Sequence, residues 1–334
     1  MSAAAQYGLT TEQIARFHDE GFLVVEEVFE PAILAALEEG ITQVIQDAAG
    51  QLFADRKLTS TYADEPFDRR LSRITAENKA VISQITDGAL AIPAFFELIR
   101  YRPLLNIAES LCGPELIASS VYRLRPKLPN YGPGVVPWHQ DSGYFEPYCD
   151  KSLILTCWIP LVDADASNGC LQVLKYGHRG ALAPHGSGPH HYLEIADKDL
   201  PPGEIVTVPV RRGGVLLLTN LTPHCSTPNE TDGIRWSMDL RYQSADLPTN
   251  APITRLPQET TPDFSAPSAC YPPEADVLIR SSKRSDQVIG SAEEFDRIRR
   301  DHVPGEITER WGDPNLWKEG GRRRRGHANA AHAL

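Results

Sequence analysis

The sequence lacks the features that define several broad classes of protein. Its six cysteines include no CxxC pair and no tight framework spacing, which is typical of reduced thiols inside a cell. It shows no basic and apolar leader, and no apolar run is long enough to span a bilayer. Positive charge is scarce too, since a net charge of -11 argues against a general nucleic-acid binder or a protein of anionic membranes. We therefore expect a cytoplasmic protein with no nucleic-acid or membrane partner.

The first third of the chain is predicted to be helical. Thr10 and Gln13 can form a capping box at the start of one helix, and Pro31 suits the first turn of a second. A further helix is expected over 92–111. The region 51–86 is polar and lacks periodicity, so it is predicted to form loops and short helical pieces.

From residue 116 the pattern changes to β. Short apolar segments are separated by turns such as Asn168-Gly169, and no helices lie between them. This pattern indicates a sandwich or barrel rather than a βαβ sheet. Proline recurs after Tyr242, so that region is predicted to wrap the surface as coil before a helix over 292–300. The expected strands cover 22–25, 119–124, 153–161, 171–174, 204–210, 215–219 and 234–243.

Candidate metal ligands lie in and after the segment Pro137-Trp138-His139-Gln140-Asp141. If the segment is extended, His139 and Asp141 share a face, because strand side chains alternate. The apolar stretch 215–220 then delivers a second histidine, His224, to the mouth of the barrel. Two imidazoles and one carboxylate occupy one face of an octahedron and leave the other open, as in non-haem Fe(II) oxygenases.

Arg235 opens the next predicted strand, within reach of a ligand held on the same metal. A 2-oxo dicarboxylate can chelate iron at one end and leave its other carboxylate to an arginine fork, which lysine cannot reproduce. Arg241 shares a strand face with Arg235, but six residues of strand span about 20 Å, so the two cannot both reach this cosubstrate. We assign Arg235 to the cosubstrate and expect Arg241 to form a solvent-side ion pair.

The chain resembles the phytanoyl-CoA dioxygenase family of Fe(II)- and 2-oxoglutarate-dependent oxygenases over most of its length, from residue 19 to about 243. The family's usual Pro-Gly-Ser-His stretch is replaced by Lys175-Tyr176-Gly177-His178, so that turn is expected to differ and His178 to be structural or to support a ligand. The resemblance implies a mainly β fold with flanking helices, a double-stranded β-helix (jelly-roll, cupin-like) barrel. It is strongest in Trp138-His139-Gln140-Asp141-Ser142-Gly143-Tyr144-Phe145, Cys157-Trp158-Ile159-Pro160-Leu161, 168–174, His178-Arg179-Gly180, and Pro223-His224 with Arg235.

The resemblance also implies roles for individual residues. His139, Asp141 and His224 match the iron ligands, and Arg235 matches the arginine that pairs with the distal carboxylate of 2-oxoglutarate. Ser226 matches a hydroxyl that supports this carboxylate, and Trp158 matches an aromatic residue beside the cosubstrate. The implied cofactor is Fe(II) and the cosubstrates are 2-oxoglutarate and O2. The implied reaction oxidises an unactivated C–H bond, in the first instance by hydroxylation, and releases succinate and CO2. Halogenation is disfavoured because Asp141, which a halogenase gives up for chloride, is present.

The predicted domain plan is one oxygenase domain over 1–320. It comprises a helical part over 8–112, a jelly-roll core over 116–244 and a wrapping segment over 245–320. The run Arg322-Arg323-Arg324-Arg325 falls in a tail, 321–334, that we expect to be disordered rather than a binding patch.

The substrate is predicted only by class. Tyr144, Phe145 and Tyr148 are expected to border the open face of the metal, where they pack either a substrate or the core of a lid. No basic cluster there matches the phosphates of an acyl-CoA, so a secondary metabolite, amino-acid derivative or free acid fits as well as an acyl-CoA.

Two other classes stay open. A cupin-like metal-dependent enzyme that does not use 2-oxoglutarate would not need Arg235. A non-catalytic binding protein on the same scaffold would have lost a ligand, and none is missing from the pattern. The sequence assigns no oligomeric state.

Overall fold

The computed structural model describes residues 6–85, 92–119, 123–145, 150–187, 192–247 and 276–301. Helices dominate its first part and strands the rest. Within these residues no helix is both long and apolar enough to cross a membrane. The helices are α2 (Thr11–Glu20), α3 (Pro31–Ala54), α4 (Phe67–Glu77), α5 (Ala80–Ile85), α6 (Pro93–Ile99), α7 (Arg102–Cys112) and α8 (Ala292–Asp301).

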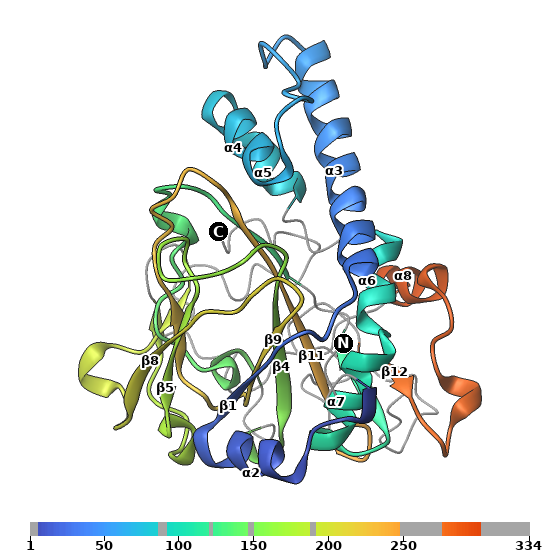
Figure 1. Cartoon of the computed structure of the whole chain (residues 1–334), viewed down its shortest axis with the longest axis vertical. Helices are drawn as coiled ribbons and strands as arrows, with labels where there is room; N and C mark the ends of the chain where they lie inside the picture. Colours follow the sequence, from blue (N-terminus) through green and yellow to red (C-terminus); the bar gives the residue numbers. More distant parts are fainter. Residues whose placement is uncertain are drawn as a thin grey trace.

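The strands form two facing antiparallel sheets, the jelly-roll arrangement, and a small extra pair. The larger sheet has the order β1-β9-β4-β11-β2-β12, with β3 also paired to β11, and the smaller has the order β10-β5-β8. Figure 1 shows α3, α6 and α7 beside the larger sheet, with β5 and β8 on the opposite side. The strands are β1 (Phe22–Val25), β2 (Leu116–Ser119), β3 (Arg123–Lys127), β4 (Ile154–Pro160), β5 (Leu171–Lys175), β6 (Gly186–Ser187), β7 (Leu193–Glu194), β8 (Glu204–Val208), β9 (Val215–Leu218), β10 (His224–Ser226), β11 (Arg235–Ser244) and β12 (Asp276–Arg280).

The two faces of the larger sheet serve different purposes, because side chains alternate along each strand. On β11, Trp236, Met238 and Leu240 belong to the hydrophobic core shared with the helices. The alternate residues Arg235 and Asp239 face the smaller sheet and line a cavity. On β4 and β9 the same alternation places apolar side chains against the helices and a second apolar cluster between the sheets. One face of β11 thus carries charged side chains into the interior of the barrel, and its other face packs in the hydrophobic core.

Several predicted elements are confirmed in detail. Thr10 and Gln13 form the capping box of α2, and each accepts a hydrogen bond from the other's backbone N–H. Pro31 is in the first turn of α3. Gly21 ends α2 with φ of 87°, a left-handed value that favours glycine.

Other predictions need correction. The helix expected over 92–111 is two helices, because Pro103 cannot donate an N–H inside a helix and instead lies in the first turn of α7. The region 51–86 is more helical than predicted: Leu71 and Ile74, one turn apart in α4, are fully buried in the core. The carboxyl-terminal region predicted as coil contributes β12 to the edge of the larger sheet. The predicted tail, 321–334, and most of the proline-rich segment lie outside the described residues.

Candidate metal centre

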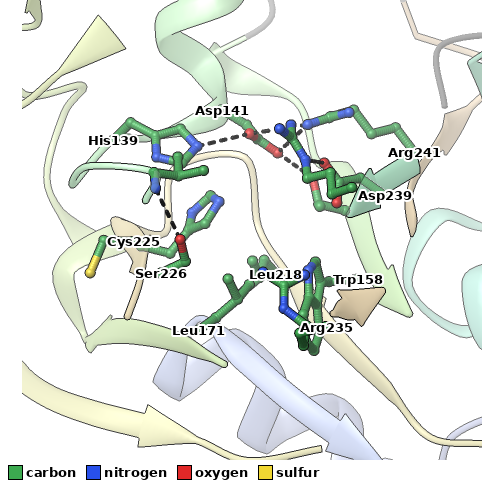
Figure 2. A pocket seen from close by; sticks show the side chains of 14 residues that line it. His139, Asp141, Trp158, Leu171, Leu218, Cys225, Ser226, Arg235, Asp239 and Arg241 are labelled. Atoms are coloured by element: carbon green, nitrogen blue, oxygen red, sulfur yellow. Dashed lines mark hydrogen bonds and ion pairs between the residues drawn. The ribbon is translucent and has the colours of Figure 1, made fainter. Parts of the chain in front are cut away.

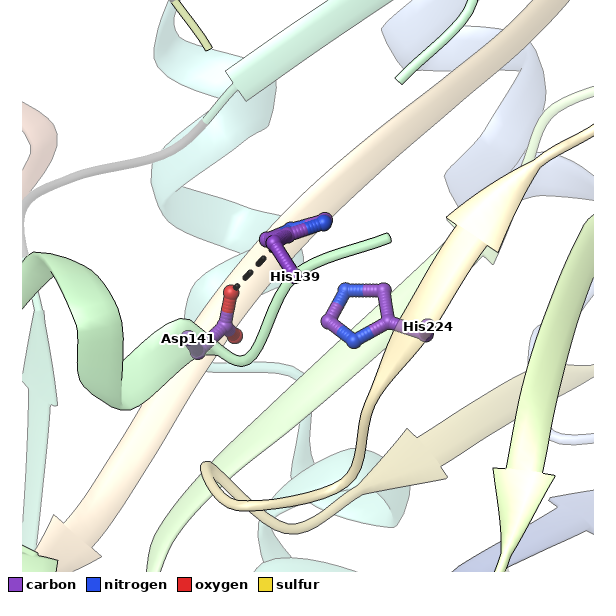
Figure 3. Close-up of side chains that lie close together, drawn as sticks. All are labelled: His139, Asp141 and His224. Carbon is purple, nitrogen blue, oxygen red and sulfur yellow. Dashed lines mark ion pairs between the residues drawn. The ribbon is translucent and has the colours of Figure 1, made fainter. Parts of the chain in front are cut away.

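The structure brings His139, Asp141 and His224 together in the barrel. Each offers one ligand atom, these atoms lie within 4.8 Å of one another, and all three residues are buried. The two imidazole rings have centroids 4.2 Å apart, and Nε2 of His139 lies 3.8 Å from Oδ1 of Asp141. Figure 3 shows the three side chains converging on one point from two separate segments.

The backbone that presents these groups differs from the expectation of a continuous strand through His139 and Asp141. His139 makes a single antiparallel bridge to His224, with N–H···O distances of 3.0 and 2.9 Å. Asp141 begins a 3-10 helix, Asp141–Tyr144. The bridge fixes the spacing of the two histidines, and the tight turn brings the carboxylate back toward them.

Both imidazoles are oriented by backbone carbonyls. Nδ1 of His139 lies 2.9 Å from the carbonyl oxygen of Pro137, and Nδ1 of His224 lies 2.9 Å from that of Thr222. A carbonyl only accepts hydrogen bonds, so each Nδ1 carries the proton and each Nε2 keeps a lone pair for a metal. Burial, followed by the neighbouring His224, holds the pKa of His139 well below its usual value, which keeps that ring neutral.

Asp141 is held ionised and in one orientation. Burial alone would raise its pKa, but Arg241, the two histidines and the hydroxyl of Thr156 together lower it. Thr156 donates to Oδ2, and Nη2 of Arg241 lies 3.2 Å from both oxygens. The donor set of two imidazoles and one carboxylate fits a divalent iron ion.

Arg241 therefore does not form the solvent-side ion pair that we expected. Its side chain is 11% exposed, and its partner is Asp141 inside the barrel. Because its face of β11 is turned toward the smaller sheet, this arginine has a buried carboxylate within reach rather than water.

A cavity of about 460 Å³, measured to its open mouth, lies next to the three candidate ligands. The walls combine charged and apolar side chains, most of which Figure 2 labels. They are Arg125, Val136, His139, Asp141, Thr156, Trp158, Leu171, Leu218, His224, Cys225, Ser226, Arg235, Asp239 and Arg241.

The three residues predicted to hold the cosubstrate all line this cavity. Arg235 is buried, with its guanidinium 5.3 Å from the centre of the Trp158 ring and one nitrogen donating to Ser237. Its Nε is buried and has no hydrogen-bond partner among the described residues. Ser226 accepts hydrogen bonds from Nζ of Lys127 at 2.7 Å and from the N–H of Val136 at 3.0 Å. The hydroxyl proton of Ser226 is thus left to donate to an acceptor such as a carboxylate.

Sequence reasoning missed Lys127, which the structure places directly behind this group. Lys127 is opposite Arg235 in the β3–β11 pairing, and its Nζ also donates to the carbonyl of Thr227. Burial, together with the adjacent Arg235, lowers the pKa of Lys127 to about 6. The available signal was Arg123-Leu124-Arg125-Pro126-Lys127, in which basic residues recur at the strand period of two.

Tyr144 and Phe145, two of the residues predicted to border the substrate, lie next to the candidate ligands in the sequence but do not line this cavity. Tyr144 packs edge-on against His139 with ring centroids 6.0 Å apart, and its hydroxyl accepts the N–H of Leu193. Phe145 is buried, and neither residue is among those lining the cavity. Tyr148 lies outside the described residues. His178 bonds the carbonyl of His18 through Nε2, and thus ties the altered turn to the end of α2 as a structural residue.

Comparisons with known proteins agree with this geometry. The family model for phytanoyl-CoA dioxygenase (PhyH) matches residues 17–237, which is more than half of the chain. The chain is 26% identical over 272 residues to mouse phytanoyl-CoA dioxygenase domain-containing protein 1, covering 71% of this chain and 91% of that protein. It is 25% identical over 249 residues to human peroxisomal phytanoyl-CoA dioxygenase, covering 71% and 69% of the two chains.

Among solved structures, the apo form of the non-heme monooxygenase ThoJ is similar to this one. The TM-score is 0.50 at 21% sequence identity, over 73% of this chain and 82% of that one. At this level of identity the likeness concerns the fold, and it agrees with the jelly-roll arrangement of the two sheets.

Proposed function

This chain belongs to the phytanoyl-CoA dioxygenase family, and from that membership we propose how its cavity performs an Fe(II)- and 2-oxoglutarate-dependent oxidation. The enzyme is a dioxygenase whose cofactor is Fe(II) and whose cosubstrates are 2-oxoglutarate and O2. Its substrate is a small organic molecule, and we propose hydroxylation of an unactivated C–H bond as the outcome. Residues 1–320 would form the single catalytic domain.

His139, Asp141 and His224 would hold the iron. The observation that carries this assignment is the convergence of one ring nitrogen from each histidine and a carboxylate oxygen within 4.8 Å, with both Nδ1 atoms committed to carbonyls. Bound there, the iron supplies the oxidising chemistry, in which 2-oxoglutarate is decarboxylated to succinate as the substrate is oxidised. The protein side chains bind the cosubstrate and the substrate, orient them and exclude water.

Arg235 would receive the distal carboxylate of 2-oxoglutarate. Its unpartnered Nε and its position over Trp158 support this role, because a bound carboxylate would supply the missing acceptor. Ser226 would donate its free hydroxyl proton to the same carboxylate. Lys127, behind Ser226, would add a second positive charge at this end of the cavity when the bound dicarboxylate holds it protonated.

Anaerobic titration tests the proposal directly. Fe(II) with 2-oxoglutarate should give a weak visible charge-transfer band, and admission of air should then release succinate, slowly even without substrate. His139→Ala and Asp141→Ala should abolish both signals, whereas His18→Ala, at an exposed position on α2, should preserve them. Arg235→Gln should keep metal binding and weaken 2-oxoglutarate binding.

The outcomes separate the alternatives. A metal-binding protein that shows neither the band nor succinate release would be a cupin-like protein that does not use 2-oxoglutarate. Failure to bind Fe(II) at all would favour a non-catalytic binding protein on the same scaffold.

A further inference from the structure

Asp239 and Arg125 form a buried charged pair in the cavity that neither the iron nor the cosubstrate uses. Nε of Arg125, on β3, donates to Oδ2 of Asp239, on β11, at 2.7 Å. The Asp239 side chain is 8% exposed, and that of Arg125 is 25% exposed. Both line the cavity together with the candidate iron ligands.

The second oxygen of Asp239 has no partner. Oδ1 is buried and accepts no hydrogen bond from any of the described residues. A buried carboxylate oxygen without a donor is unfavourable by about 1–3 kcal/mol or more, so such an atom points to a donor that arrives with a ligand. The cosubstrate cannot be that ligand, because 2-oxoglutarate carries two carboxylates and a ketone and has no proton to donate at neutral pH.

Arg125, in contrast, has hydrogen-bond donors that no described residue uses. Arg125 lines the cavity, and its side-chain hydrogen bonding to described residues runs through Nε alone, so the two terminal nitrogens of the guanidinium remain available to a ligand. Arg235 is assigned to the cosubstrate, and Arg241 is bound to Asp141. Of the three arginines that line the cavity, Arg125 is the one placed to receive an anionic group of the substrate.

The net charge of the cavity also favours an anionic substrate. Three guanidinium groups face two carboxylates, those of Asp141 and Asp239. An Fe(II) ion and a 2-oxoglutarate dianion would cancel each other, so the loaded site keeps an excess positive charge that favours an anionic substrate.

The distance from Asp239 to the iron site also allows a molecule bound there to reach the iron. Asp239 precedes Arg241 by two residues on the same face of β11, a separation of about 7 Å, and Arg241 touches Asp141. A molecule anchored on Asp239 and Arg125 would reach the iron with a carbon a few bonds away from its charged end.

Resting on the function proposed above, we propose that the substrate is a small amino acid or hydroxy acid, with its carboxylate bound by Arg125 and its ammonium or hydroxyl bound by Asp239. The pair is thus a determinant of specificity, and it excludes molecules that lack either group. A neutral hydrocarbon chain would leave Oδ1 of Asp239 without a donor.

Binding to a catalytically silent form tests this class. Protein loaded with Mn(II) and 2-oxoglutarate would be mixed with the common amino acids, the hydroxy acids with the same side chains, the plain carboxylic acids and the amino-acid methyl esters. Proton relaxation of each compound reports its approach to the metal. At least one amino or hydroxy acid should relax strongly, and its plain acid and its ester should bind at least about tenfold more weakly.

Comparison of the first two groups shows whether the donor is an ammonium or a hydroxyl. Asp239→Asn and Arg125→Gln should each weaken the best compound by about tenfold or more and leave 2-oxoglutarate affinity within about twofold. Arg100→Gln, which alters an exposed pair with Glu97 on α6, is the matched control and should change nothing. Arg125→Lys keeps the charge without the fork and should fall between.

Three results would overturn the inference: no compound approaches the metal in protein that binds 2-oxoglutarate, the plain acid or ester binds equally well, or both variants bind like the parent. Loss of 2-oxoglutarate binding by the parent protein would instead count against the proposed function. Circular dichroism and thermal unfolding identify a variant that fails to fold, in which case Arg125→Lys carries the test.

Discussion

Nη2 of Arg241 lies 3.2 Å from each carboxylate oxygen of Asp141. The guanidinium occupies the side of the carboxylate that faces β11, while Oδ1 is directed toward His139. In the metal-free protein this arginine is the main cation that stabilises a buried negative charge. A divalent ion bound at the same carboxylate would also stabilise that negative charge.

Arg241→Met should destabilise the metal-free protein by about 3 kcal/mol, because the variant leaves a buried carboxylate without its cation. Saturating Mn(II) should restore a large part of that loss, since binding to the folded state alone stabilises it. Urea unfolding with EDTA and with Mn(II) measures both values. Arg16→Met, in an exposed pair with Glu20, should have little effect in either condition. An equal loss with and without metal would show that Arg241 does not act through Asp141.

Substitution of Arg235 should separate cosubstrate binding from metal binding. Arg235→Lys and Arg235→Gln should both raise the Kd of 2-oxoglutarate by about 100-fold, because each removes the planar fork that makes two charge-assisted hydrogen bonds. The Mn(II) affinity, measured by electron paramagnetic resonance without 2-oxoglutarate, should stay within about threefold. Full retention of cosubstrate affinity by the lysine variant would mean that the fork geometry is not used.

Cosubstrate affinity should depend on pH through Lys127. Its pKa of about 6 in the folded protein lies below the usual 10.5, so at pH 7 the folded chain has released a proton that the unfolded chain keeps. The charged groups that face it are Arg235 and Arg125, which lower its pKa, with the thiols of Cys225 and Cys170 opposing them. A bound dicarboxylate favours the protonated ammonium, so binding should take up a proton, and affinity should fall by up to about tenfold per pH unit above pH 6.

Calorimetry of 2-oxoglutarate binding in buffers of different ionisation enthalpy checks this proton uptake. Lys127→Met should flatten the dependence between pH 6.5 and 8, and Lys57→Met, at an exposed site, should not. The same linkage means that Lys127 destabilises the fold at low pH and that this penalty disappears as pH rises toward 10.5. A parent protein whose affinity is constant across this range would contradict the prediction.

Gly21 should tolerate no side chain. Its φ is 87°, and a β-carbon there would lie 2.3 Å from Nδ1 of His178. Gly21→Ala should therefore lower the free energy of unfolding by about 2 kcal/mol or more, through backbone strain and displacement of His178. Gly50→Ala, inside α3 with nothing near the new methyl, should raise it by about 0.5–1 kcal/mol. Thermal unfolding of the pair measures the contrast, and a Gly21→Ala variant as stable as the parent would rule out the close contact.

Much of the fold could be predicted from local sequence. Thr10, Gln13 and Pro31 mark helix starts through contacts within a few residues, and the β character after residue 116 follows from apolar segments between turns. The break between α6 and α7, just before Pro103, and the edge strand β12 were not predicted. The first depends on which of two adjacent turns the proline joins, and the second on pairing with β2, far away in the chain.

The candidate site, too, was predictable in part from the sequence and in part only from the tertiary structure. The sequence by itself determined the residue types at positions 139, 141, 224 and 235, because a motif and its spacing belong to the chain. Only the tertiary structure decided that Arg241 meets Asp141, that Lys127 lies behind Ser226, and that Asp239 keeps a free oxygen beside Arg125. Those relationships join segments more than 90 residues apart, and a buried charged side chain acquires its partner only when the sheets close around it.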